Sequence, residues 1–215
     1  MSARENILAR IRARHGKPAT PTADERAAVH SHIETHPVSP RPRADWELPA
    51  RFRECALGLA STVEEVDTPA AAPAAVARYL RAGSLPLAAV CWPELAALDW
   101  RAAGIEIAVR AARDTDLVGI TGAFCAIAET GTLLTVAGVQ TPAAASLLPE
   151  THVAIVPVSR IVRGMEEAWQ LARSELGQLP RAVNFISGPS RTADIEQTVT
   201  LGAHGPYRMH VILTR

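Results

Sequence analysis

The hydrophobic and polar positions of this chain follow two periods, one typical of helices and one typical of strands, from about Trp46 onward. Apolar residues spaced three or four apart predict helices, and short apolar runs rich in β-branched residues predict strands. In chain order the pattern predicts a helix over 48–59, a strand over 62–66, a helix over 73–82, a strand over 87–92, a helix over 94–103, and strands over 104–109 and 116–121. Strands that alternate with helices in this way predict an α/β fold with a largely parallel sheet flanked by helices.

The second half of the chain continues the alternation with more small residues. It predicts a turn or short helix over 122–128, strands over 133–137, 151–158, 182–186 and 209–213, and an amphipathic helix over 164–176 that Gly177 ends. Ligands of parallel sheets bind beyond the carboxyl ends of the strands. We therefore look for chemistry in the loops that follow strands.

The first 45 residues have a different character from the rest. Residues 2–15 predict a helix with an apolar stripe at Ile7, Leu8 and Ile11 and arginines on the opposite side, and residues 16–45 hold five prolines. One or two helical turns are also expected within 24–36. A helix this short is not stable by itself, so we expect it to dock on its own domain or on another subunit. The predicted organisation is an N-terminal helix and proline-rich linker over 1–45 and an α/β domain over 46–215.

Charge and cysteine usage exclude several classes of protein. Lysine plus arginine and aspartate plus glutamate number 22 each, so no overall charge favours nucleic acid or membrane lipid. The three cysteines lack C-x-x-C spacing, which argues against disulfides and against an iron–sulfur cluster of the chain's own. We expect buried thiols in the cytoplasm, no metal and no cofactor. His30, His32 and His36 are expected to be solvated, and the uncharged stretch 130–149 is too rich in threonine and proline to be a membrane helix.

The stretch 181–197 carries the clearest candidate site. A strand over 182–186 ends at Ser187-Gly188-Pro189, and a helix is predicted to begin near Ser190. Backbone N–H groups at such a helix start bind anions, and the side chains of Ser190, Arg191 and Thr192 suit a carboxylate or phosphate. The alternative is an ordinary helix start with a solvated arginine.

A second group of candidates lies in the central block and near the C-terminus. Glu129 is the only acidic or basic residue between Asp116 and Glu150, so it is expected to act in a site, to pair with Arg191 or to reach solvent. His204 lies between two glycines and is either an acid, base or anion ligand or a cap of its own loop. The predicted pocket has Glu129 and His204 as catalytic residues. Its ligand-binding residues are Thr121, Gly122, Gly131, Thr132, Gly188, Ser190, Arg191 and Thr192.

Three blocks of sequence carry a resemblance to a known family. GITGAFCAIAETGTLLT at 119–135, SGPSRTADIE at 187–196 and LGAHGP at 201–206 occur in the order found in the LUD-domain family, and the chain resembles its lactate-utilisation type from about Ala50 to the end. The resemblance implies a fold similar to the NagB/RpiA/CoA-transferase group. It also implies a role beside iron–sulfur partner proteins in oxidising L-lactate to pyruvate.

Two other functions stay open beside the one that the resemblance implies. The first is a stand-alone enzyme that acts on a CoA ester or a sugar phosphate, as relatives of the fold do. In the CoA-transferase fold a glutamate in a place comparable to Glu129 serves as a nucleophile, but a shared fold does not fix a role. The second is a structural or regulatory subunit.

Overall fold

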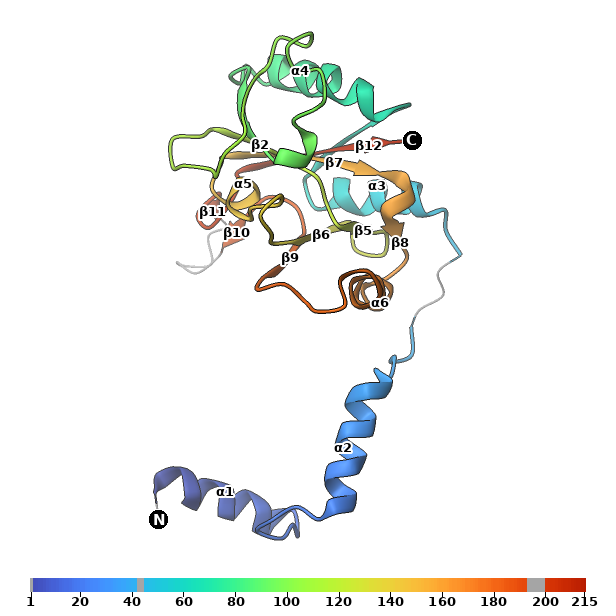
Figure 1. Cartoon of the computed structure of the whole chain (residues 1–215), viewed down its shortest axis with the longest axis vertical. Helices are drawn as coiled ribbons and strands as arrows, with labels where there is room; N and C mark the ends of the chain where they lie inside the picture. Colours follow the sequence, from blue (N-terminus) through green and yellow to red (C-terminus); the bar gives the residue numbers. More distant parts are fainter. Residues whose placement is uncertain (1, 42–44, 193–199) are drawn as a thin grey trace. The chain divides into compact units, whose positions relative to one another are not determined.

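The computed structural model describes residues 2–41, 45–192 and 200–215 (Figure 1). The chain divides into two compact units, Met1–Arg43 and Ala44–Arg215. The larger unit holds both main sheets and the residues of the candidate site.

The smaller unit consists of two helices, α1 (Ala3–Arg14) and α2 (Ala23–Thr35). Each begins with a capping box, formed by Ser2 with Glu5 and by Thr22 with Glu25, so the first free N–H groups of both helices are satisfied. The helix predicted over 2–15 is confirmed, and α2 is longer than the one or two turns expected. The predicted separation of a basic side from an apolar stripe is wrong, because spacings of three and four residues place Arg4 and Arg14 on the same face as Ile7 and Ile11.

The larger unit is built on a six-stranded sheet in the order β1-β12-β7-β4-β2-β3, and all of its neighbouring strands are parallel. The strands are β1 (Thr62–Val66), β2 (Ala88–Cys91), β3 (Glu106–Ala108), β4 (Val118–Thr121), β7 (Thr151–Pro157) and β12 (Arg208–Thr214). The predicted α/β fold with a largely parallel sheet flanked by helices is thereby confirmed.

A smaller sheet of four strands has the order β8-β5-β6-β9. Its strands are β8 (Ile161–Val162), β5 (Cys125–Ile127), β6 (Thr132–Val136) and β9 (Val183–Ile186). The prediction of a turn or short helix over 122–128 is wrong, because β5 pairs with β6 and β8 and is fully buried. Small residues fit there because both faces of this sheet are covered.

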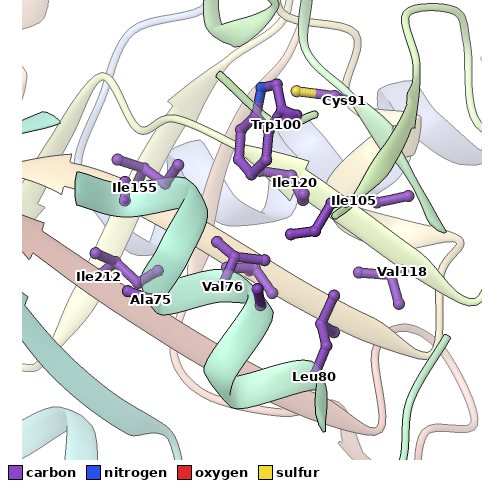
Figure 2. Close-up of a cluster of buried hydrophobic side chains, with 14 residues drawn as sticks. Ala75, Val76, Leu80, Cys91, Trp100, Ile105, Val118, Ile120, Ile155 and Ile212 are labelled. Carbon is purple, nitrogen blue, oxygen red and sulfur yellow. The ribbon is translucent and has the colours of Figure 1, made fainter. Parts of the chain in front are cut away.

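The helices and the two sheets of the larger unit are stacked in layers (Figure 1), and the hydrophobic clusters show which elements pack together. Helix α4 (Ala72–Ala82) covers one face of the large sheet, where Val76 and Leu80 pack against Ile120 and Ile212 (Figure 2). Helix α3 (Leu48–Gly58) and the small sheet cover the other face. Helix α6 (Met165–Leu176) packs on the outer face of the small sheet. The remaining short elements are α5 (Ala144–Leu147) and the 3₁₀ turns η1 (Pro69–Ala71), η2 (Pro93–Leu95) and η3 (Val158–Arg160).

The helix predicted over 94–103 is wrong. Only η2 forms, and turns follow it, because local hydrogen bonds hold the chain in another shape. Trp100 Nε1 donates to the carbonyl of Leu95 at 2.9 Å, and Asp99 Oδ1 accepts from the N–H of Ala102 at 3.0 Å. Aspartate competes with the helical backbone in this way.

Within residues 2–41, 45–192 and 200–215, we find no helix that is both long and apolar enough to cross a bilayer.

Candidate functional site

Several of the predicted site residues meet at the C-terminal end of α3. Gly131 (φ +66°) and Gly188 (φ +79°) both have left-handed backbone conformations and approach this helix closely. A Cβ atom on Gly131 would lie 2.4 Å from the backbone nitrogen of Ala56, and one on Gly188 would lie 2.5 Å from the carbonyl oxygen of Leu59. Both glycines therefore pack directly against the backbone at the end of α3.

A chain of three hydroxyl groups runs beside these glycines. Thr130 Oγ1 donates to Thr132 Oγ1 at 2.8 Å, and Thr132 Oγ1 and Ser187 Oγ are 2.8 Å apart. Thr132 is buried, whereas Thr130 and Ser187 are exposed. The order β6, β9 in the small sheet brings them together, since Leu133 pairs with Ile186 and the next residues outward are Thr132 and Ser187.

Arg191 lies at the same helix end. Its Nη2 donates to the carbonyl oxygen of Leu59 at 2.9 Å, and Leu59 is the C-cap of α3. A cation is favourable there because the last carbonyls of a helix carry partial negative charge. The helix predicted to begin near Ser190 is wrong at its start: Arg191 and Thr192 form β10, which pairs antiparallel with β11 (Thr200–Leu201). Residues 193–199, the rest of that predicted helix, lie outside the described residues.

Glu129 does not pair with Arg191 in the structure. Its carbonyl oxygen accepts a hydrogen bond from Cys55 Sγ at 3.4 Å. Its carboxylate interacts electrostatically with Arg51, which lies one helical turn before Cys55 in α3. The hydrogen bond to Glu54 raises the pKa of Arg51, and the nearby Cys55 and Glu129 raise it further. Sequence reasoning missed Arg51, although its spacing of four residues from Cys55 places both on one face of α3.

Ser190 ties this region to the loop 202–206. Its backbone N–H donates to Pro206 O at 2.9 Å, and its carbonyl accepts from the N–H of Gly202 at 3.0 Å. The hydroxyl of Ser190 accepts from the N–H of His204 at 3.3 Å. The backbone of His204 therefore helps to close its own loop.

Thr121 and Gly122 lie elsewhere, beyond the carboxyl end of β4. Thr121 pairs with Ala154 of β7, and Ala154 pairs with Val211 of β12. Val211 is three residues after Arg208, so Thr121 lies about 10 Å further along the strand direction than Arg208. The loop 202–206 enters β12 before Arg208, at the opposite edge of the sheet. The structure thus separates Thr121 and Gly122 from the group around Ser190.

Two residues beside Thr121 and Gly122 were not predicted. His152 is fully buried, its Nε2 lies 2.7 Å from Thr121 Oγ1, and burial lowers its pKa to about 4. Glu94 is exposed overall, but its carboxylate lies against Gly122, where a Cβ would be 2.5 Å from Oε1, and partial desolvation raises its pKa. The position of Glu94 in the turn that follows β2 was the signal that could have identified it.

Across the described part of the chain no group of three or more histidine, cysteine or acidic side chains is placed to hold a metal ion. His30 and His32 of α2 and its C-cap His36 are exposed.

Comparison with known proteins identifies the family. The model of the LUD domain matches residues 93–214, and the chain belongs to this family. A protein named Lactate utilization protein C from Exiguobacterium sp. (strain ATCC BAA-1283 / AT1b) is 43% identical over 111 residues, which cover 50% of this chain and 46% of that protein. The protein of the same name from Bacillus subtilis (strain 168) is 39% identical over 99 residues, which cover 45% of this chain and 41% of that protein. The matches therefore span about half or less of the length of these curated relatives.

A solved structure shares the fold. The crystal structure of a DUF162 family protein from Deinococcus radiodurans is 25% identical, with a TM-score of 0.60, and the match covers 82% of this chain and all of that chain.

Proposed function

We propose that this chain is a component of an L-lactate utilisation system, in which it binds a small carboxylate and works with iron–sulfur partner proteins that oxidise L-lactate to pyruvate. The observation that supports this function is the identity of 39–43% to relatives named Lactate utilization protein C, within a chain of the LUD family. In this proposal the chain is cytoplasmic, and its three cysteines, which are free thiols, are compatible with that setting.

The proposed carboxylate site is the group at the end of α3. Arg191 supplies a guanidinium. Hydroxyl groups that can donate or accept hydrogen bonds come from Ser190, Thr192 and the chain of Thr130, Thr132 and Ser187. Because no helix begins at Arg191, recognition rests on these side chains rather than on helix N–H groups. A guanidinium can hold a carboxylate by two parallel hydrogen bonds, which a lysine cannot do.

Substitution of Arg191 by lysine tests this site. A lysine can still donate one hydrogen bond to Leu59 O, so α3 stays capped while the two-pronged contact to a ligand is lost. We expect Arg191→Lys to weaken binding of L-lactate or pyruvate about ten- to a hundredfold in a calorimetric titration, with an unchanged melting temperature. Arg101→Lys, at another exposed arginine, is the matched control. Equal affinity of the parent and Arg191→Lys for every carboxylate tested would remove Arg191 from the site.

The role beside iron–sulfur proteins needs a separate experiment. The chain, expressed with a tag in a cell that grows on L-lactate, should co-purify with proteins that show the absorbance of iron–sulfur clusters. Absence of such proteins under conditions that preserve clusters would contradict the assembly, and turnover of L-lactate by the isolated chain would show that partners are not needed.

A further inference from the structure

Four large apolar side chains are exposed together at the amino-terminal edge of the large sheet. They are Leu117, Leu147, Leu148 and Tyr207, and we call them the edge patch. Leu148 is 55% exposed and Tyr207 is 47% exposed. Single apolar residues are ordinary on a protein surface, whereas a contiguous group of them marks an interaction surface.

Backbone hydrogen bonds place two members of the edge patch side by side. The N–H of Thr151 donates to Leu117 O at 3.0 Å, and the N–H of Arg208 donates to Glu150 O at 3.0 Å. Leu117, Glu150 and Tyr207 therefore directly precede the three neighbouring strands β4, β7 and β12, in register. Since neighbouring strands are about 5 Å apart, Leu117 and Tyr207 are separated by about 10 Å, with Glu150 between them.

The end of α5 supplies the other two members. This helix packs closely on β4, because a Cβ atom on Gly119 would lie 2.0 Å from the carbonyl oxygen of Ala145. Gly119 is two residues after Leu117, so both positions face α5. Leu147 and Leu148 follow Ala145 at the end of α5 and are exposed beside the strand starts.

Two charged residues of opposite sign border the edge patch. Arg208 Nη1 and Glu150 Oε2 are 4.0 Å apart, and the guanidinium of Arg208 lies 5.0 Å from the ring centroid of Tyr207. The patch and its border together carry no net charge, so they favour neither an acidic nor a basic partner. A two-fold axis through this surface would place Glu150 of each copy opposite Arg208 of the other. The surface is therefore complementary in charge to itself.

We propose that the edge patch is the interface of a two-fold dimer of this chain. Leu148 and Tyr207 of each copy pack against the patch of the other, and Glu150 pairs with Arg208 across both halves of the interface. This inference does not depend on the proposed function. The interface borders the candidate carboxylate site, because a Cβ atom on Gly205 would lie 3.9 Å from Leu147 O and 3.3 Å from Ser190 Cβ.

Charge reversal tests this interface directly. Sedimentation velocity of the full chain, over about a hundredfold range of concentration, should show a dimer for the parent. Glu150→Arg and Arg208→Glu should each weaken the dimer about ten- to a hundredfold, because like charges then meet twice in the interface. An equimolar mixture of the two variants should form a heterodimer, since each copy then offers the charges that the other needs.

Removal of an apolar contact tests the patch without changing a charge. Leu148→Ser should weaken the dimer about ten- to a hundredfold, because the substitution occurs twice in a two-fold interface. Leu179→Ser is the matched control, since Leu179 is 51% exposed but lies in the connection between α6 and β9. It should leave the dimer as strong as in the parent. Melting curves of every variant check that the fold is kept.

Three outcomes would overturn the dimer. The first is a parent chain that stays monomeric at every concentration. The second is a dimer that is equally strong in the parent, in Leu148→Ser and in both charge-reversal variants, because another surface then forms it. The third is a monomeric parent whose co-purification with iron–sulfur proteins is lost in Leu148→Ser but kept in Leu179→Ser. In that case the edge patch binds a different protein, and the proposed function stands without the dimer.

Discussion

At the scale of single residues, the carbonyl oxygen of Leu59 explains why several predicted site residues lie together. It belongs to the end of α3, where the last carbonyls have no partner within the helix. Arg191 donates to this oxygen, and the backbone of Gly188 packs against it. Arg191 thus has a structural role that exists without any ligand. The substitution Arg191→Lys is chosen for this reason, because lysine can keep the hydrogen bond to Leu59 O but cannot hold a carboxylate by two parallel hydrogen bonds.

The glycine at position 131 should be required for stability. In Gly131→Ala the new methyl group would lie 2.4 Å from Ala56 N, and the backbone would keep φ +66°, which is unfavourable for alanine. The steric clash and the backbone strain both destabilise the folded state. We expect a loss of about 3 kcal/mol in the free energy of unfolding, measured with urea. Gly177→Ala is the matched control, because it has φ +67° with no atom within 4 Å and should lose only about 1 kcal/mol. Equal losses in the two variants would show that contact with α3 adds nothing.

Acid should destabilise the protein before its carboxylates titrate fully. Burial lowers the pKa of His152 and of His210 from 6.5 to about 4. Between these values the unfolded chain binds more protons than the folded one, so stability is complete above pH 6.5 and falls as the pH decreases toward 4. The difference amounts to about 3 kcal/mol for each histidine.

Urea unfolding at several pH values between 7.5 and 5 measures this effect. His210→Gln should reduce the slope of stability against pH by about half in that range, because one of the two buried histidines is gone. A free energy of unfolding that stays constant from pH 7.5 to 5 would show that the two rings do not stay neutral in the folded state.

At the scale of elements, the sequence predicts well those segments that have a clean period. The helices over 48–59, 73–82 and 164–176 and the strands over 62–66, 133–137, 151–158 and 182–186 all form, with ends shifted by at most one residue. The prediction fails where neighbours decide the structure. Residues 122–128 are apolar and mostly small, and only their pairing between two strands makes Cys125–Ile127 a strand.

The candidate site was predicted less well than the elements for the same reason. Ser187 contacts Thr132, and Gly131, Gly188 and Arg191 all contact the end of α3, a helix end that no sequence motif marks. His152 was overlooked because its position within an apolar strand gives no sign of which face its ring occupies. Thr121 lies at the carboxyl ends of the strands, away from the group around Ser190, because of the order in which the strands pair. Local sequence patterns do not give that order.

Arg160 should hold α6 to the small sheet. Its guanidinium makes a two-pronged contact with Glu175 of α6 at 2.7 and 3.0 Å, and its Nε donates to Phe124 O at 2.7 Å. We expect Arg160→Ala to lower the free energy of unfolding by about 2 kcal/mol, because Phe124 O loses its donor and the helix loses an ion pair. Arg173→Ala, at an exposed arginine of the same helix, should change it by less than about 1 kcal/mol. Similar effects of both changes would mean that Arg160 acts only as a surface charge.

At the scale of the whole molecule, charge is distributed unevenly over a chain whose formal net charge is zero. The segment 2–17 carries four arginines and Lys17 against the single acidic residue Glu5. Ile7 and Ile11 of α1 are about half exposed, and neither α1 nor α2 has a buried residue. The first unit therefore stabilises its helices with capping boxes and the ion pair of Lys17 with Glu25, and not with a core of its own.

The N-terminal helix should accordingly serve association and not the stability of the α/β unit. We expect deletion of residues 2–15 to leave the melting temperature of the chain unchanged, because residues 44–215 hold all four hydrophobic clusters. Association with the proposed partner proteins should weaken, and more strongly at low salt, since the segment that is lost is basic. Replacing Ile7 and Ile11 by serine in the full chain keeps every charge, so it separates apolar from electrostatic contributions. A drop of several degrees in the melting temperature of the isolated deletion variant would show instead that α1 belongs to the core of the larger unit.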